Sequence, residues 1–182
     1  MSRARKFLKL APGVSKPDTA SSTGRSTLDA LGGADFRIDF TNGELPDPKL
    51  NRFHEIWLSK CQGGRLPGRG DFDPTELPPE FLPWITIFDV EEERFRVRIV
   101  GTGIVAALEF DATGRYTDEL PNTKALEARA RWAVGNAKPY FMTDLPIPWD
   151  QEHYTRYSVI CLPLANDGID VDKLLYMMTF DH

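Results

Sequence analysis

The chain of 182 residues has few of the residues that build metal centres or disulfide frameworks. Its two cysteines, Cys61 and Cys161, lie far apart and in no metal-ligand spacing, so we expect reduced thiols. Its three histidines form no HExxH or comparable pattern, and we expect no metal site. No apolar run approaches the roughly 18 residues of a membrane span. These absences predict a cytoplasmic protein without stable membrane insertion.

Positive charge is scarce outside the first residues. Residues 1–26 hold six Lys and Arg against one Asp, whereas residues 27–182 hold sixteen against twenty-six Asp and Glu. Neutralising nucleic-acid phosphates needs a concentrated basic patch, so we expect no nucleic-acid partner. Residues 1–33 are rich in Ser, Thr, Gly and basic residues and are predicted to be a disordered tail. Residues 34–182 are predicted to form a single domain.

Motifs for catalysis are also missing. No Ser, Cys or Lys falls within a recognisable nucleophile motif, and the acidic residues are scattered rather than paired. We therefore predict no catalytic residues, although a small cavity enzyme stays an alternative because distant residues can pair in space. Gly101 and Gly103, between a strand and a helix, also fit a dinucleotide-binding fingerprint. Residues 94–99 disfavour that reading, because the first strand of such a fold is apolar on both faces.

A β-hairpin is predicted near the middle of the chain. Residues 84–90 form an apolar run and residues 91–93 a polar break, after which Phe95, Val97 and Ile99 alternate with arginines. Strict alternation places these three apolar side chains on one covered face and the arginines on the other. An antiparallel sheet with a covered face is therefore expected.

Two longer helices accompany the hairpin. An Asp-Pro pair begins a helix at 47–62, with Phe53 and Trp57 on its apolar stripe. A second helix begins after 122–123 and ends at Pro139.

Three more strands are predicted at 140–143, 154–164 and 173–180, with a turn at 166–168 between the last two. The order of strands, helices and strands is typical of an α+β fold.

Several short motifs follow one another in a fixed order between residues 51 and 180. They are the single residue Trp57, then LPGRGDFDP at 66–74, LPW at 82–84, FRVRIVGT at 95–102, DATGR at 111–115 and LPL at 162–164. This series resembles PAS domains, and more narrowly the small stand-alone bacterial PAS-like proteins with the pattern LPSRxDxDP, LPW, FRxRLVGT, GRDLTGR and LPL. Two departures are Gly68 in place of Ser, and Glu109 and Phe110 in place of Gly-Arg.

The resemblance implies a five-stranded antiparallel sheet in the order 2-1-5-4-3, with helices on one face and an N-terminal flanking helix. It also implies a non-catalytic sensory or regulatory module that binds a small apolar or amphipathic metabolite, contacts other signalling proteins, or does both. A ligand-free interaction module is the alternative, and no cofactor is assigned. Because PAS domains often pair through a flanking helix, a homodimer with Phe53 and Trp57 at its interface is predicted. The alternative for this helix is that it covers the core of its own domain.

Seven residues are the candidates for lining a cavity between the long helix and the sheet. Aromatic side chains with a polar tip suit a pocket that is mostly apolar with a few orienting hydrogen bonds. The alternative is that all seven are core residues. The candidates are Phe95, Val97, Ile99, Trp132, Tyr140, Tyr157 and Cys161.

Overall fold

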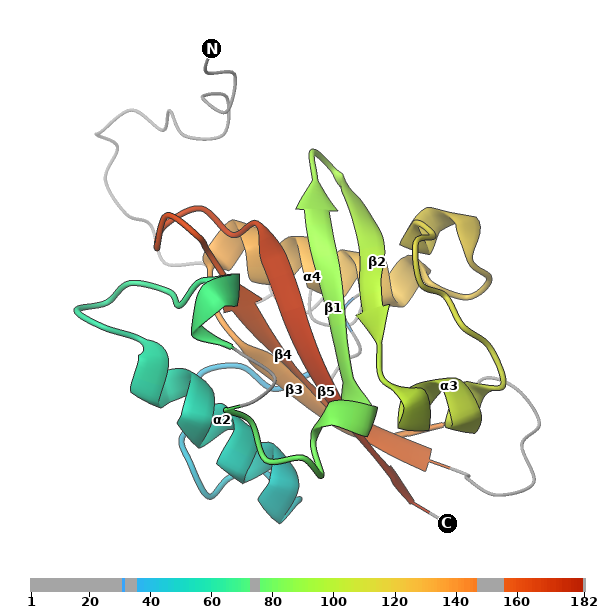
Figure 1. The fold of residues 1–182 in the computed structure, drawn as a ribbon, viewed down its shortest axis with the longest axis horizontal. Coiled ribbons are helices and arrows are strands. Elements are labelled where there is room, and N and C mark those ends of the chain that lie inside the picture. The colour runs from blue at the N-terminus through green and yellow to red at the C-terminus, as the bar shows by residue number, and fades with distance from the viewer. Residues whose placement is uncertain (1–30, 32–35, 73–75, 147–155, 182) are drawn as a thin grey trace, which may run out of the picture.

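The structure, a computed structural model, describes residues 31, 36–72, 76–146 and 156–181. Its centre is a five-stranded antiparallel sheet in the order β2-β1-β5-β4-β3 (Figure 1). The strands are β1 (Ile85–Glu91), β2 (Arg94–Val100), β3 (Tyr140–Pro146), β4 (Arg156–Leu164) and β5 (Lys173–Asp181). The helices are α2 (Pro48–Lys60), α3 (Thr102–Leu108) and α4 (Lys124–Asn136). The predicted α+β fold and its strand order are confirmed.

Helices cover both faces of the sheet. Figure 1 shows α2 in front of the sheet and α4 behind it. The side chains of β4 alternate between these two layers, and almost the whole strand is buried. Ile160, Leu162 and Leu164 join α2 in what we call the outer core, whereas Val159 and Cys161 join α4 in the inner core. The flanking helix therefore lies on the sheet face opposite α4.

Leu31 lies within the predicted tail of residues 1–33, yet it is 5% exposed and belongs to the inner core. Its carbonyl oxygen accepts a hydrogen bond from Arg129. The packed part of the chain thus begins before residue 34, and the rest of the predicted tail up to residue 30 lies outside the described residues.

The sequence of α2 explains both its start and its position. Asp47 caps the helix, because its carboxylate accepts a hydrogen bond of 2.7 Å from the Lys49 amide, and Pro48 follows at the first helical position. Phe53 is fully buried and Trp57 is 4% exposed, both within the outer core. The prediction that these two side chains lie at a dimer interface is therefore wrong, because they cover the apolar outer face of their own sheet.

Truncating the α2 stripe should therefore cost stability rather than association. We expect Trp57→Ala to lower the free energy of unfolding by about 3–5 kcal/mol, as large core truncations do. The variant also loses the 3.0 Å hydrogen bond from the indole Nε1 to the Pro163 carbonyl. The matched control is Leu58→Ala on the same helix, because Leu58 is 42% exposed. Urea unfolding measures both, and equal small losses for the two variants would contradict this packing.

His54 is a titratable group buried in the same layer. Its side chain is 2% exposed, its Nδ1 lies 2.8 Å from the Asn42 Oδ1, and its ring stacks on Trp57 at 5.9 Å between centroids. Burial lowers the pKa of His54 to about 4. The folded protein thus holds this imidazole neutral.

This burial makes stability depend on pH. The unfolded chain binds a proton at His54 near pH 6.5, whereas the folded chain does so only near pH 4. His54 therefore does not lower the free energy of unfolding above pH 6.5, and it lowers that free energy increasingly as the pH falls from 6.5 toward 4. We expect His54→Gln to remove a decline on the order of 2 kcal/mol over that window. Unfolding free energies at several pH values measure it. Parallel curves for the variant and the wild type would show that His54 does not contribute.

The hairpin contains a β-bulge that changes which side chains face inward. Successive residues of β1 lie opposite Ile99 and Val97, so Arg98 is an extra residue on β2. The alternation breaks there: Ile99 is 40% exposed, whereas Val100 is partly buried against the inner core. The predicted inward orientation of Ile99 is therefore wrong, and Val100 takes that place.

Gly101 connects β2 to α3 where two backbone segments approach closely. A Cβ at this position would lie 2.3 Å from the Pro83 carbonyl oxygen, so only glycine fits. The strand before it, β2, is at the edge of an antiparallel sheet. A dinucleotide-binding first strand is instead central and parallel, so the fold contradicts that alternative.

Candidate functional site

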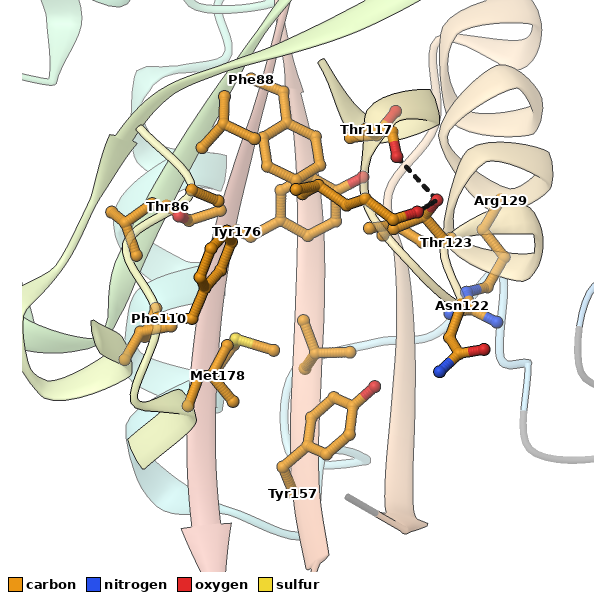
Figure 2. Close-up of a pocket in the computed structure, with 18 of the residues that line it drawn as sticks. Thr86, Phe88, Phe110, Thr117, Asn122, Thr123, Arg129, Tyr157, Tyr176 and Met178 are labelled. Carbon is orange, nitrogen blue, oxygen red and sulfur yellow. Dashed lines mark hydrogen bonds between the residues drawn. The ribbon is translucent and has the colours of Figure 1, made fainter. Parts of the chain in front are cut away.

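A pocket of about 410 Å³ lies between the inner face of the sheet and helices α3 and α4 (Figure 2). Its volume falls in the range of small-molecule sites. Much of its wall is apolar and comes from β1, β2, β4, β5 and α4. Prominent apolar residues of the wall are Phe88, Val97, Val100, Leu126, Val159 and Met178.

Three of the predicted residues meet in this pocket. Val97 comes from β2, Tyr140 from β3 and Tyr157 from β4. Burial raises the pKa of Tyr157, and the nearby charge of Arg129 partly offsets the rise. Strands distant in the sequence thus supply one wall.

The other four candidates lie elsewhere. Phe95 is 2% exposed and Cys161 is fully buried, both in the inner core but outside the pocket wall. Trp132 packs edge-on against Phe36, with 5.2 Å between ring centroids. Ile99 faces away because of the bulge. The prediction that these four residues line the pocket is therefore wrong. Three of them are packing residues, and one lies at the surface.

Tyr140, Cys161 and Tyr176 form a polar row across three neighbouring strands of the inner face. Cys161 lies opposite Tyr140 on one side and opposite Tyr176 on the other. Burial raises the pKa of all three side chains, in the case of Cys161 to about 12. All three groups are therefore uncharged at neutral pH, and Tyr140 and Tyr176 place their rings in the pocket wall.

Most of the lining residues were not predicted from the sequence, and Arg129 is the charged one among those the structure describes. It extends from α4 into the pocket wall, and Figure 2 shows its side chain on the same side of the pocket as Asn122. A signal was present in the sequence. Arg129 stands three residues after Leu126 and four before Ala133, which places a charge on the apolar stripe of the helix.

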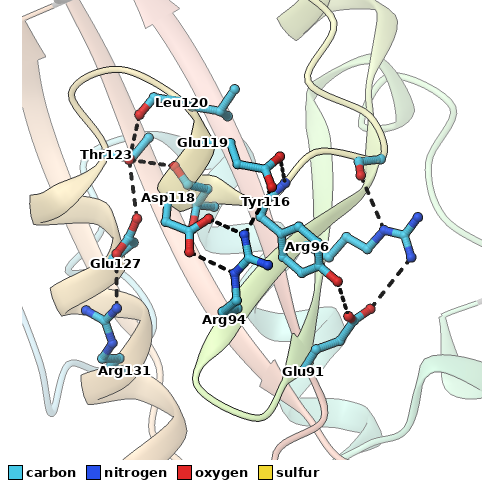
Figure 3. Close-up of polar contacts among 12 residues, drawn as sticks. Glu91, Arg94, Arg96, Tyr116, Asp118, Glu119, Leu120, Thr123, Glu127 and Arg131 are labelled. Atoms are coloured by element: carbon cyan, nitrogen blue, oxygen red, sulfur yellow. Dashed lines mark hydrogen bonds and ion pairs between the residues drawn. The ribbon is translucent and has the colours of Figure 1, made fainter.

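The arginines of β2 form a second polar cluster, outside the pocket (Figure 3). Arg94 donates two hydrogen bonds to Asp118, of 2.8 Å from Nε and 2.6 Å from Nη2, and its guanidinium lies 3.6 Å from the Tyr116 ring centroid. The bond from Arg94 lowers the pKa of Asp118. The Tyr116 hydroxyl in turn donates to Glu91 at 2.6 Å.

These contacts hold the loop at residues 114–119 against β2, the edge strand of the sheet. Gly114 donates to the Val97 carbonyl at 2.7 Å, and the Val97 amide donates to the Arg115 carbonyl at 2.9 Å. Arg96 lies 3.9 Å from Glu91, and Arg98 pairs with an aspartate of β1 at 3.8 Å. The β2 arginines therefore have acidic partners and protect an edge strand, as edges in native sheets require.

Within the described ranges, no group of His, Cys, Asp and Glu is arranged to hold a metal ion. A search of the same residues for a helix long and apolar enough to cross a membrane also finds none.

The strand order 2-1-5-4-3, with α3 and α4 over one face, is the arrangement that the sequence resemblance implied. The fold is PAS-like. Comparisons of this PAS-like chain with models of protein families and with curated proteins find no match.

Among solved structures, the chain is similar to the PAS domain of the histidine kinase ThkA. The likeness has 15% sequence identity and a TM-score of 0.40, covering 53% of this chain and 99% of that one. A selenomethionine variant of the same domain gives 13% identity, a TM-score of 0.42, and coverage of 52% and 98%.

Proposed function

We propose that this PAS-like domain is a non-catalytic sensory or regulatory module that binds a small amphipathic molecule in the pocket between the sheet and helices α3 and α4. The observation that supports this most is the pocket itself, which has about 410 Å³ within one domain. Close packing normally leaves few voids larger than a water molecule in a core. A space of this size therefore suits an occupant.

The distribution of side chains indicates an occupant with two kinds of surface. Figure 2 shows Phe110 and Met178 on one side of the pocket, and Asn122 and Arg129 on the other. An apolar wall with a few convergent polar groups is typical of sites that orient a small ligand.

The polar residues around the pocket favour binding over catalysis. The described residues of its wall include Thr, Asn, Arg and Tyr, but no His, Cys, Ser, Lys, Asp or Glu. The tyrosines Tyr140, Tyr157 and Tyr176 have raised pKa values because they are buried, so they are poor bases near neutral pH. The wall thus offers little for proton transfer or nucleophilic attack.

A bound molecule would contact α3, α4 and the sheet together. Ile104 belongs to α3 and Leu126 to α4, while Met178 belongs to β5. A ligand that prefers one arrangement of these elements shifts the population toward it. We propose that another protein reads this shift by direct contact, and that the domain acts as a cytoplasmic signalling module.

Two neighbouring residues of β2 provide a matched test. Val100 lines the pocket, whereas Ile99 is 40% exposed outside it. We expect Val100→Trp to fill the pocket and abolish a bound mass in native mass spectrometry of protein purified from cells. Ile99→Trp should keep that mass, since its indole lies outside the wall.

Thermal unfolding distinguishes a ligand-binding module from the alternative, an interaction module that binds no ligand. Adding a large side chain to a filled core costs roughly 1–3 kcal/mol, whereas an open pocket accepts it. Strong destabilisation by Val100→Trp, together with no bound mass in the wild type, would decide for an interaction module without a ligand.

A further inference from the structure

Arg129 carries a buried charge that has no acidic partner among the described residues. It is 8% exposed, and no salt bridge joins it to a described Asp or Glu. Its Nη1 donates a long hydrogen bond of 3.4 Å to the Leu31 carbonyl, and its Nε has no partner within the described ranges. Arg131, on the same helix, instead pairs with Glu127 at 3.0 Å.

This arrangement is physically costly unless something complements it. A guanidinium does not lose its proton in proteins, so burial leaves Arg129 charged. A buried charge without a counter-charge is strongly destabilising, and the usual remedies are an ion pair and well-formed hydrogen bonds. The free Nε of Arg129 points to a complement that the chain itself does not supply within the described residues.

The surroundings of Arg129 define what that complement is. The Arg129 guanidinium lies close enough to Tyr140 and Tyr157 that its charge lowers the pKa of both hydroxyls against the larger effect of burial. Asn122 lies on the same side of the pocket and adds an amide (Figure 2). Donors thus cluster at one end of a space whose other side holds Met178.

We propose that the ligand is an apolar molecule that ends in a carboxylate, with the carboxylate bound at Arg129 and the apolar part between Val100 and Met178. The planar fork of a guanidinium matches the two oxygens of a carboxylate, which is why arginine is common where carboxylates are bound. This inference rests on the proposed function and names the class of ligand for the same pocket.

Decanoate and decanol test the inference, because they share an apolar chain and differ in the charged group. Isothermal titration at pH 7.5 compares their affinities for the full chain. We expect decanoate to bind at least about tenfold more tightly than decanol, since hydrogen bonds to a charged group are the stronger ones. Arg129→Met should abolish this preference, and Arg131→Met, outside the pocket wall, should keep it.

Arg129→Lys retains the charge without the fork, so it should retain part of the preference. The comparison within the wild type needs no variant, so equal affinities overturn the inference even if Arg129→Met does not fold. Retention of the full preference by folded Arg129→Met overturns it as well. Equal binding that Val100→Trp abolishes leaves the proposed pocket function standing. Binding of neither compound overturns the inference, and the bound mass from cells then decides the pocket function separately.

Discussion

The central strands of this sheet are apolar on both faces, and the rest of the structure follows from the need to cover them. Ile160 and Leu162 face one side while Val159 and Cys161 face the other, and all four are buried. A sheet of this kind is stable only when each face packs against another layer. Helix α2 supplies the outer cover, and α3 and α4 supply the inner one.

The two covers differ in how completely they fill the space beneath them. The outer layer brings large side chains, including Phe53 and Trp57, which are almost completely buried. The inner helix α4 brings small ones, and Ala130 and Ala133 are its fully buried apolar residues. Small side chains occupy less volume above the sheet, and the pocket lies beside this helix.

Local signals in the sequence were sufficient for much of the fold. Asp47 and Pro48 marked the start of α2 because capping depends on neighbouring residues alone. The alternation of Arg with Phe95 and Val97 marked the hairpin for the same reason. Ile99 was misplaced because a bulge depends on how two strands pair. The consecutive apolar residues Ile99 and Val100 were the trace of that break in the sequence.

The positions of the remaining candidate residues depend on tertiary packing, which a local sequence pattern does not reveal. The stripe of α2 showed that Phe53 and Trp57 would be covered, but a stripe does not specify whether its own sheet or a second copy covers it. Arg129 stood on an apolar stripe, yet only the fold shows that it lines the same pocket as Tyr140 and Tyr157, which come from two strands. Pocket residues come from elements distant in sequence, and periodicity carries no information about which of them meet.

NMR of the arginine side-chain Nε–H groups during a titration with decanoate tests the carboxylate site at Arg129 most directly. A carboxylate bound at Arg129 should give a large shift of the Arg129 signal, contacts between the ligand chain and Val100 or Met178, and an unchanged Arg131 signal. An Arg129 signal that stays in place while decanoate binds would contradict it.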